Sequence, residues 1–434
     1  CPGSGRLRLA DGHLRPVGDK SVTHRALILN ALAEGRSSIT HGNPGADPRS
    51  TAACLRALGV SIDAHGHGNW SVRGRGPLLR PATDALDCGN SGTTMRLLAG
   101  VCAGQPFTSI LDGDESLRSR PMARVAKPLR AIGARVEGPT NGERPPLVVT
   151  GGTLHDASLE IEVASAQVKS CLLLAALVAG VEMEVREPAP SRDHTERMLR
   201  AMGAALESGP GWARLGRRAV AHAIDVDVPG DPSAAALMAS VVAVVPGSEV
   251  TFEDLLHNPT RTAFVDVLAA GGVGTGWSGG RESAGDAIAS LTVSASETLQ
   301  PLRVEADVVP SLIDEVPALA AVAAFAEGTS VFEGVGELRV KESDRITSMV
   351  ELLGTFGVTT EATADRLVVH GGGVRRPLAE IPATVDHRIA MAAAVLAAGV
   401  SARDGAGPIP VDLSVAAVSH PGFAADLEGL RVDA

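Results

Sequence analysis

The chain has 434 residues, of which 44% are hydrophobic and 21% charged, and its 39 Lys and Arg against 50 Asp and Glu give a net charge of −11. This composition is typical of a globular protein of two or three domains, and no apolar stretch approaches the roughly 18 residues of a membrane span. The acidity, and an aromatic content of seven Phe, three Trp and no Tyr, argue against nucleic-acid binding, which needs a basic face and rings on which bases stack.

The five cysteines are scattered and form no CxxC pair; they are Cys1, Cys54, Cys88, Cys102 and Cys171. An odd, dispersed set fits a reducing compartment and argues against a structural zinc site. The first residues lack a basic stretch followed by an apolar one, so the sequence predicts no signal peptide. We therefore expect a cytoplasmic protein without a metal.

One design recurs six times along the chain: an Ala/Leu-rich helical stretch, a glycine, then a β-like run. A glycine directly after a helical run commonly stops the helix in the left-handed conformation. The alternating residues that follow, as in 181–185 and 329–332, predict strands. The six stretches are Ala26–Gly35, Met95–Gly104, Ser170–Gly180, Ala234–Gly247, Pro317–Gly328 and Ile389–Gly399.

A second helix end recurs between these stretches, again closed by glycine. The copies are Leu55–Gly59, Leu129–Gly133 and Leu199–Gly203, with looser versions at Val267–Gly271 and Leu353–Gly357. Each is followed by a polar turn and a second strand, such as Arg366–His370. The repeating unit therefore has roughly seventy residues, with two helices and several strands.

Positively charged side chains gather in or near the first turns of these expected helices. A helix N-terminus carries about half a positive charge, so a Lys or Arg there is unfavourable by a few tenths of a kcal/mol. One such residue is unremarkable and would pair with a nearby acid on the surface, but eight in an acidic protein indicate a bound anion where the helix ends converge. They are Lys20, Arg25, Arg96, Arg120, Arg192, Lys341, Arg345 and Arg388.

Seven short motifs contain most of these cations. They are Gly18–Arg25 (GDKSVTHR), Gly89–Thr93 (GNSGT), Arg120–Met122 (RPM), Ser165–Gln167 (SAQ), Arg192–Glu196 (RDHTE), Lys341–Arg345 (KESDR) and Asp386–Arg388 (DHR). In type and order they resemble the motifs of the 5-enolpyruvylshikimate-3-phosphate (EPSP) synthase family, the 3-phosphoshikimate 1-carboxyvinyltransferases. Any one motif is weak evidence, but the set is specific and spans essentially the whole chain.

The resemblance implies an α/β (α+β) fold of two lobes, each built from three βαβαββ units, with the active site in the cleft between them. One lobe would span 18–230, and the other would combine 1–17 with 231–434. In this family substrate binding closes the lobes, which excludes water and strengthens electrostatic contacts. We expect a monomer.

The reaction that the resemblance implies transfers the enolpyruvyl group of phosphoenolpyruvate (PEP) to the 5-hydroxyl of shikimate 3-phosphate, on the route to chorismate and the aromatic amino acids. The PEP methylene is protonated, the hydroxyl attacks C2, and a tetrahedral intermediate loses phosphate. Both substrates carry a phosphate and a carboxylate, which accounts for the surplus of cations. This chemistry needs general acids and bases and charge neutralisation but no cofactor, and the partners are these two small anions, with no nucleic acid or membrane.

The same resemblance assigns the binding residues. Shikimate 3-phosphate would be held by Lys20, Ser21, Arg25, Ser165, Ala166, Gln167, Arg192, Asp314 and Lys341. PEP would be held by Lys20, Asn90, Gly92, Thr93, Arg120, Gln167, Arg345 and Arg388. Gly92 would let PEP approach the backbone, because a Cβ there would intrude. Its presence also implies inhibition by glyphosate, which competes for the PEP site in this family.

Three residues are candidates for proton transfer. By resemblance, Asp314 is the general base for the attacking hydroxyl, oriented with Lys341, whereas Glu342 and Lys20 are the candidates at the PEP methylene. By its position alone, an Asp before an Ala-rich helix would be interpreted as a helix cap or first-turn acid. The catalytic assignment therefore depends on the motifs.

Some positions depart from the family pattern and leave alternatives open. Ala166 stands where many members have a second Ser, Glu337 where some have Asn, and 418–421 lacks a Lys that touches PEP in some members. An enolpyruvyl transferase with another phosphorylated acceptor remains possible, as does a non-catalytic anion-binding repeat protein. The branch acting on UDP-N-acetylglucosamine is disfavoured, since the loop 114–119 has no Cys.

Overall fold

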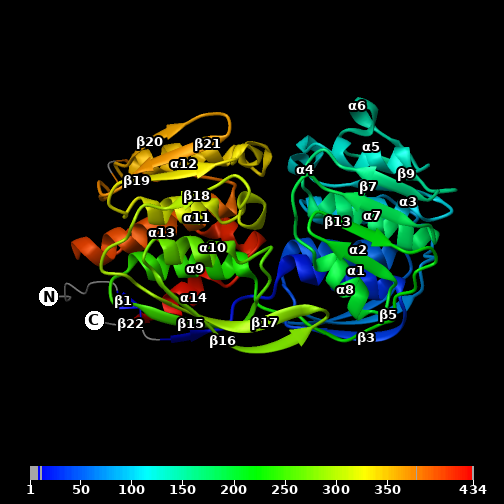
Figure 1. Ribbon diagram of the computed structural model, residues 1–434, viewed down its shortest axis with the longest axis horizontal. Coiled ribbons are helices and arrows are strands. Elements are labelled where there is room, and N and C mark those ends of the chain that lie inside the picture. The colour runs from blue at the N-terminus through cyan, green and yellow to red at the C-terminus, as the bar shows by residue number, and fades with distance from the viewer. Residues whose placement is uncertain (1–7, 10–11, 378, 433–434) are drawn as a thin grey trace. The chain divides into compact units, whose positions relative to one another are not determined.

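The computed structural model of the chain describes residues 8–9, 12–377 and 379–432, which divide into two compact units (Figure 1). The 18–229 unit comprises Gly18–Pro229 together with Glu282–Asp286. The 230–434 unit comprises Gly230–Arg281, Ala287 onwards and the residues up to Val17. Each unit has its own cluster of buried apolar side chains. The segment Glu282–Asp286 is an addition that the boundaries expected from the sequence do not include.

The sheets of the 18–229 unit repeat one topology. Their strands are β3 (Glu34–Thr40), β4 (Ser61–Gly66), β5 (Asn69–Arg75), β6 (Leu86–Asp87), β7 (Thr108–Asp112), β8 (Arg135–Glu137), β9 (Leu147–Thr150), β10 (Ala157–Glu160), β11 (Met183–Arg186), β12 (Leu206–Gly209), β13 (Trp212–Leu215) and β14 (Val226–Asp227). They are ordered β14-β3-β5-β4, β6-β7-β9-β8 and β10-β11-β13-β12. In each sheet a parallel pair is extended by two antiparallel strands.

The 230–434 unit contains two sheets of this pattern within the described residues. Their strands are β2 (Gly12–Leu14), β15 (Glu249–Leu256), β16 (Gly274–Ser283), β17 (Asp286–Ser294), β18 (Arg303–Val304), β19 (Thr329–Glu333), β20 (Thr359–Ala362) and β21 (Arg366–His370), ordered β16-β17-β15-β2 and β18-β19-β21-β20. A further antiparallel pair joins β1 (Arg8–Leu9) to β22 (Arg431–Val432). The repeated βαβαββ fold is thus confirmed, and its sixth copy is the least regular.

The chain passes between the units near Val17 and again near Pro229, each time soon after a short strand. β2, which precedes the first passage, pairs in parallel with β15, and β14, which precedes the second, pairs in parallel with β3. Within the 18–229 unit the Asp19 N–H donates to Pro229 O over 2.7 Å, and within the 230–434 unit the Asp231 N–H donates to Val17 O over 2.8 Å. Each passage is therefore fixed next to the start of a long helix.

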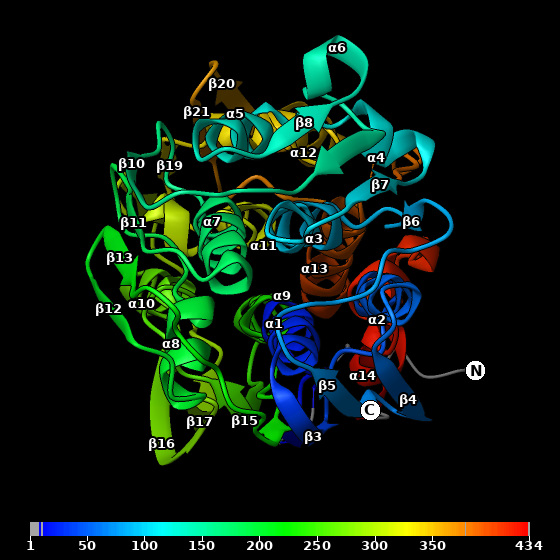
Figure 2. The ribbon, with the colours of Figure 1, turned by 90° about the vertical axis from the view of Figure 1, so that its right-hand side faces the viewer.

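Helices fill the space between the sheets. In the 18–229 unit they are α1 (Lys20–Leu32), α2 (Ala46–Ala57), α3 (Gly92–Ala103), α4 (Glu115–Ser119), α5 (Ala123–Ala131), α6 (Pro139–Gly142), α7 (Ala166–Ala179) and α8 (His194–Ala201). In Figures 1 and 2, α1, α3 and α7 lie among the other elements of this unit. Nearly all their residues are buried, including polar ones such as His24 and Arg25 of α1.

The 230–434 unit has the same plan. Its helices are α9 (Pro232–Val244), α10 (Ala263–Ala270), α11 (Val316–Ala323), α12 (Arg345–Thr355), α13 (His387–Asp404) and α14 (Phe423–Gly429), with 3₁₀ turns η1 (Val309–Ser311), η2 (Gly336–Val340) and η3 (Ser414–Val418). α9 and α13 are buried along almost their whole length. Small Ala side chains permit this close packing of helices around one core.

The glycines predicted to end helices divide into two groups. The shorter helices behave as expected: α2 and α8 are each followed by a glycine with positive φ, Gly59 and Gly203. Gly180 likewise caps α7 in the left-handed conformation. Two other predictions are wrong. Gly35 lies inside β3, and α13 continues through Gly399 to a left-handed cap at Gly405.

Close packing explains Gly399. A Cβ at this position would lie 2.4 Å from the ring of Phe325 and 2.9 Å from Val244. The glycine therefore allows α13 to approach neighbouring elements, and it does not end the helix. The described residues contain no helix long and apolar enough to cross a membrane, and no group of three or more His, Cys, Asp or Glu that could hold a metal ion.

Candidate active site

Side-chain caps fix where the helices that bear the predicted residues begin. Asp19 accepts the Val22 N–H at the start of α1, and Ser91 and Ser165 do the same for α3 and α7. In the other unit Asp344 caps α12 and Asp386 caps α13. A capping side chain satisfies an N–H that the helix leaves unpaired. The sequence therefore determines the first turn, and hence the place of Lys20, Gly92, Gln167, Arg345 and Arg388.

Lys20, the first residue of α1, forms an ion pair with Asp47 of α2. The distance between Lys20 Nζ and Asp47 Oδ2 is 3.0 Å, with the two side chains 22% and 11% exposed. Burial would raise the pKa of Asp47, but the charge and the hydrogen bond of Lys20 outweigh burial and hold it below its usual value. Burial lowers the pKa of His24 to about 3, opposed by Asp47 and assisted by Lys20 and Arg25. The first turns of α1 therefore contain a charged Lys20 and, four residues later, a neutral His24.

Arg25 is almost fully buried one turn further along α1. Its Nε donates to Thr195 Oγ1 over 2.7 Å, its Nη2 to Ser170 Oγ over 3.0 Å and its Nη1 to Ser21 O over 3.0 Å. These contacts connect α1 to α7 and α8. Ser21 and Arg25 are therefore brought together, as the sequence predicts for the site of the phosphorylated acceptor.

Gln167 connects α7 to α3. Its Oε1 accepts from Arg96 Nη1 over 2.7 Å, and its Nε2 donates to Thr93 Oγ1 over 2.9 Å. A Cβ added to Gly92 would lie 3.0 Å from Arg96 Nη1 and 3.4 Å from Arg120 Nη1. Two guanidinium groups thus face the backbone at the start of α3.

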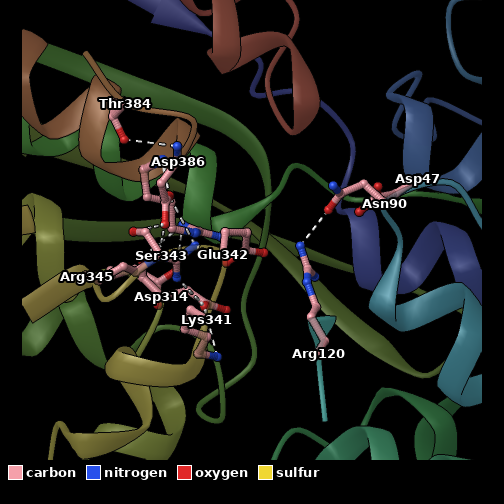
Figure 3. Close-up of polar contacts among 12 residues, drawn as sticks. Asp47, Asn90, Arg120, Asp314, Lys341, Glu342, Ser343, Arg345, Thr384 and Asp386 are labelled. Atoms are coloured by element: carbon pink, nitrogen blue, oxygen red, sulfur yellow. Dashed lines mark hydrogen bonds and ion pairs between the residues drawn. The ribbon is translucent and has the colours of Figure 1, made fainter. Parts of the chain in front are cut away.

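Arg120, which follows α4, is held by the loop that precedes α3. Its Nη2 donates to Asn90 Oδ1 over 2.5 Å (Figure 3). Asn90 Nδ2 in turn donates to Asp114 Oδ2 over 2.7 Å. Five of the residues that the resemblance assigns to PEP therefore lie together, namely Asn90, Gly92, Thr93, Arg120 and Gln167. Cationic guanidinium groups around a glycine form a setting that binds phosphate and carboxylate.

Asp314, just before α11, contacts two cations. Its Oδ1 lies 3.5 Å from Lys341 Nζ and 3.4 Å from Arg345 Nη1. Its backbone oxygen accepts from Arg388 Nη1 over 3.0 Å. The predicted general base and three predicted cations are therefore brought together within the 230–434 unit.

Arg345 is 1% exposed and lies at the centre of this cluster (Figure 3). Its Nη2 donates to Glu342 Oε2 over 2.6 Å and its Nε to Asp386 Oδ2 over 2.8 Å. Burial would lower the pKa of Arg345, but Glu342, Asp386 and Asp314 raise it above its ordinary value. Asp386 is also held by the Ser343 hydroxyl over 3.0 Å. The guanidinium is thus permanently charged and fixed from three sides.

Several residues around these clusters escaped the sequence analysis. Asp47 pairs with Lys20, Glu315 lies 3.9 Å from Arg388, and Glu187 binds the N–H of Ser165. None carries a local signal, because the partner of each acid is set by packing between segments that are distant in sequence. Ala166 and Arg192 are half-buried, at the first position of α7 and just before α8.

Repeated βαβαββ units and cationic helix starts, combined with a carboxylate held by a lysine and an arginine, are the features that the resemblance to the enolpyruvyl transferases predicts. The sequence model of the EPSP synthase (3-phosphoshikimate 1-carboxyvinyltransferase) family matches residues 7–427. The chain therefore belongs to the EPSP synthase family.

Relatives in two bacteria share one name and match this chain over nearly its whole length. The chain is 45% identical over 423 residues to a 3-phosphoshikimate 1-carboxyvinyltransferase of Herpetosiphon aurantiacus, which covers 96% of each chain. It is 46% identical over 420 residues to one of Thermus thermophilus, covering 96% of this chain and 95% of the relative.

Solved structures agree with the fold. An EPSP synthase of Acinetobacter baumannii superposes with a TM-score of 0.85 at 37% identity, covering 98% of this chain and 97% of that one. The enolpyruvyl transferase NikO of Streptomyces tendae gives a TM-score of 0.71 at 19% identity, with coverage of 98% and 95%. At that identity the second likeness concerns the fold alone.

Proposed function

We propose that this protein transfers the enolpyruvyl group of PEP to the 5-hydroxyl of shikimate 3-phosphate and releases phosphate. The relatives' shared name supports this activity. The observation that carries the catalytic part is the position of Asp314, a carboxylate next to both Lys341 and Arg345. An acid fixed by two cations presents its remaining lone pairs in a defined direction, which suits a general base.

Each substrate is assigned residues from both units. Lys20, Ser21, Arg25, Ser165, Ala166, Gln167 and Arg192, with Asp314 and Lys341, hold shikimate 3-phosphate; Lys20, Asn90, Gly92, Thr93, Arg120 and Gln167, with Arg345 and Arg388, hold PEP. Cations from both clusters neutralise the phosphate and carboxylate charges, which lowers the repulsion between two anionic reactants.

Proton transfer follows from the state of each group. The Asp314 carboxylate removes the proton of the 5-hydroxyl as its oxygen attacks C2 of PEP, while the methylene carbon gains a proton and becomes a methyl group. Lys20 suits the donation, because an ammonium group has protons to give. Glu342 suits the elimination, because its carboxylate, paired with Arg345 over 2.6 Å, can take a methyl proton as phosphate leaves. The double bond is thereby restored and an enol ether is formed.

Phosphate release is the decisive assay. The purified protein is supplied with PEP and either shikimate 3-phosphate, shikimate, or other phosphorylated alcohols, and inorganic phosphate is measured. The proposal predicts release with shikimate 3-phosphate at a kcat/KM far above that for the other acceptors. A preference for another phosphorylated acceptor would assign the chain to a different enolpyruvyl transfer, and release with none would leave a non-catalytic anion-binding protein.

A further inference from the structure

We propose that Glu187 is a positioning residue for the acceptor substrate, because it fixes two separate segments that carry predicted shikimate 3-phosphate contacts. Glu187 directly follows β11, and its side chain is 0% exposed. Its side chain contacts Ser165, Ser191 and Lys169. None of these three residues is assigned to PEP or to proton transfer. The inference rests on the proposed function, and it adds a residue that no motif singled out.

One carboxylate oxygen serves both segments. Glu187 Oε1 accepts the backbone N–H of Ser165 over 3.0 Å and the hydroxyl of Ser191 over 2.6 Å. Ser165 begins the Ser-Ala-Gln segment and caps α7, whereas Ser191 immediately precedes Arg192. A hydrogen bond to a charged acceptor is about twice as strong as a neutral one. The same atom therefore sets the distance between the start of α7 and the arginine loop.

The other carboxylate oxygen fixes Glu187 itself. Glu187 Oε2 lies 2.5 Å from Lys169 Nζ, and the same ammonium lies 2.8 Å from Glu196 Oε1. All three side chains are at most 4% exposed. Burial alone would lower the pKa of Lys169, but Glu196 and Glu187 outweigh burial and raise it. Lys169 lies on α7 and Glu196 on α8, so this buried triad joins the two helices whose starts carry the acceptor contacts.

Loss of Glu187 should affect the binding of the two substrates differently. Releasing Glu187 frees Ser165, Ala166 and Arg192, which are assigned to the acceptor alone. Gln167 is shared between substrates, but its amide stays held by Thr93 and Arg96 of α3. A purely structural role would instead lower the amount of folded enzyme and leave both KM values as they are.

Steady-state kinetics of the full-length protein with PEP and shikimate 3-phosphate test the inference. Glu187→Ala should raise the KM for shikimate 3-phosphate by at least about tenfold, with a much smaller change in the KM for PEP. Glu187→Gln keeps an oxygen that can accept from Ser165 and Ser191, and should recover most of that loss. Glu196→Gln is the matched control: it removes the negative charge of the second partner of Lys169, and Glu196 does not take part in the hydrogen bonds to Ser165 and Ser191, so the substitution should lower thermal stability without changing either KM.

The outcomes are distinguishable. A wild-type protein that releases no phosphate with shikimate 3-phosphate contradicts the proposed function. A wild-type protein that does so, combined with a folded Glu187→Ala variant whose two KM values are unchanged or rise equally, overturns the role of Glu187 alone. Equal KM changes in Glu196→Gln and Glu187→Ala would also overturn it, because the effect would then belong to the buried triad and not to the anchoring oxygen.

Discussion

Asp314 gives the sharpest single-residue test of the chemistry. Its Oδ1 is held by Lys341 and Arg345, so Asp314→Asn should preserve shape while abolishing the base. We expect Asp314→Ala and Asp314→Asn each to lower kcat by at least about 10²-fold, the usual contribution of a positioned acid or base. Shikimate 3-phosphate binding, measured calorimetrically, should weaken less than turnover. A kcat near that of the wild type in either variant would refute the assignment.

His24 predicts how acid affects stability. The unfolded chain protonates a histidine below about pH 6.5, whereas the folded protein keeps His24 neutral down to about pH 3. Because the unfolded state binds the extra proton, stability falls as the pH drops below 6.5, by about 2 kcal/mol near pH 5. His24→Asn can keep the contact of Nδ1 to Thr51 Oγ1, which spans 2.7 Å, but removes this titration.

Urea unfolding at pH 7 and pH 5 measures the effect. We expect His24→Asn to be less stable than the wild type at pH 7, because a buried ring is lost. The decrease in the free energy of unfolding between pH 7 and pH 5 should be smaller in the variant by about 2 kcal/mol. An unchanged decrease would mean that His24 is protonated in the folded protein.

Residue by residue, the sequence located the cations better than their partners. Lys20 and Arg345 were expected because family motifs and helix starts mark them. Asp47, which pairs with Lys20, lies 27 positions away, on a helix whose contact with α1 only packing establishes. Asp386 pairs with Arg345 from the cap of α13, so a residue with an ordinary capping signal also neutralises a buried charge.

At the level of elements, helix starts were more predictable than helix ends. A cap is a local feature, readable as an Asp or Ser before an apolar run. Gly399 has the sequence signature of a stop, but its lack of a Cβ serves the contact with Phe325. Sequence alone does not distinguish a glycine needed for backbone conformation from one needed for close approach.

The start of α3 predicts a selective effect of one methyl group. In Gly92→Ala the new Cβ would be 3.0 Å from Arg96 Nη1, so this guanidinium group must shift by a few tenths of an ångström, and the Cβ would touch Arg120 Nη1 at 3.4 Å. Glyphosate places a longer chain than PEP between its two acidic groups, so it tolerates this narrowing less well. We expect the inhibition constant for glyphosate to rise by a larger factor than the KM for PEP.

Kinetics with glyphosate as competitor of PEP measure both factors. Gly152→Ala is the matched control in the same unit, because a Cβ there would have nothing within 4 Å; it should change neither constant. Equal increases for glyphosate and PEP in Gly92→Ala would contradict the steric explanation and indicate a general loss of anion binding.

For the whole molecule, the repeat predicted the architecture, but it did not predict which segments of the chain complete each sheet and each unit. Segments far apart in sequence complete each other's sheets, as β2 does for β15 and β14 for β3. The short strands involved, of two or three residues, give little local signal. The hairpin of β16 and β17 also carries Glu282–Asp286 into the 18–229 unit, and this depends on contacts that no periodicity encodes.

The five residues Glu282–Asp286 make the stability of the 18–229 unit depend on a segment that lies much later in the sequence. Asp286 Oδ2 lies 2.9 Å from His194 Nδ1, with both side chains buried, and Asp286 Oδ1 lies 3.6 Å from Arg197 Nε. The Asp227 N–H also donates to Ser283 Oγ over 3.1 Å. Asp286→Ala leaves His194 buried without this acceptor, so we expect the 18–229 unit to lose about 2 kcal/mol of stability.

Cysteine labelling reports on the unfolding of the 18–229 unit, because Cys54, Cys88, Cys102 and Cys171 are all buried within it. In a Cys1→Ser background, Asp286→Ala should expose these thiols to a labelling reagent at lower urea than the parent protein does. Glu282→Ala alters an exposed side chain of the same five residues and should leave the labelling midpoint unchanged. If the two variants label alike, Asp286 does not contribute to the stability of the 18–229 unit; if only Asp286→Ala shifts the midpoint, the contacts of Asp286 with His194 and Arg197 of α8 stabilise that unit.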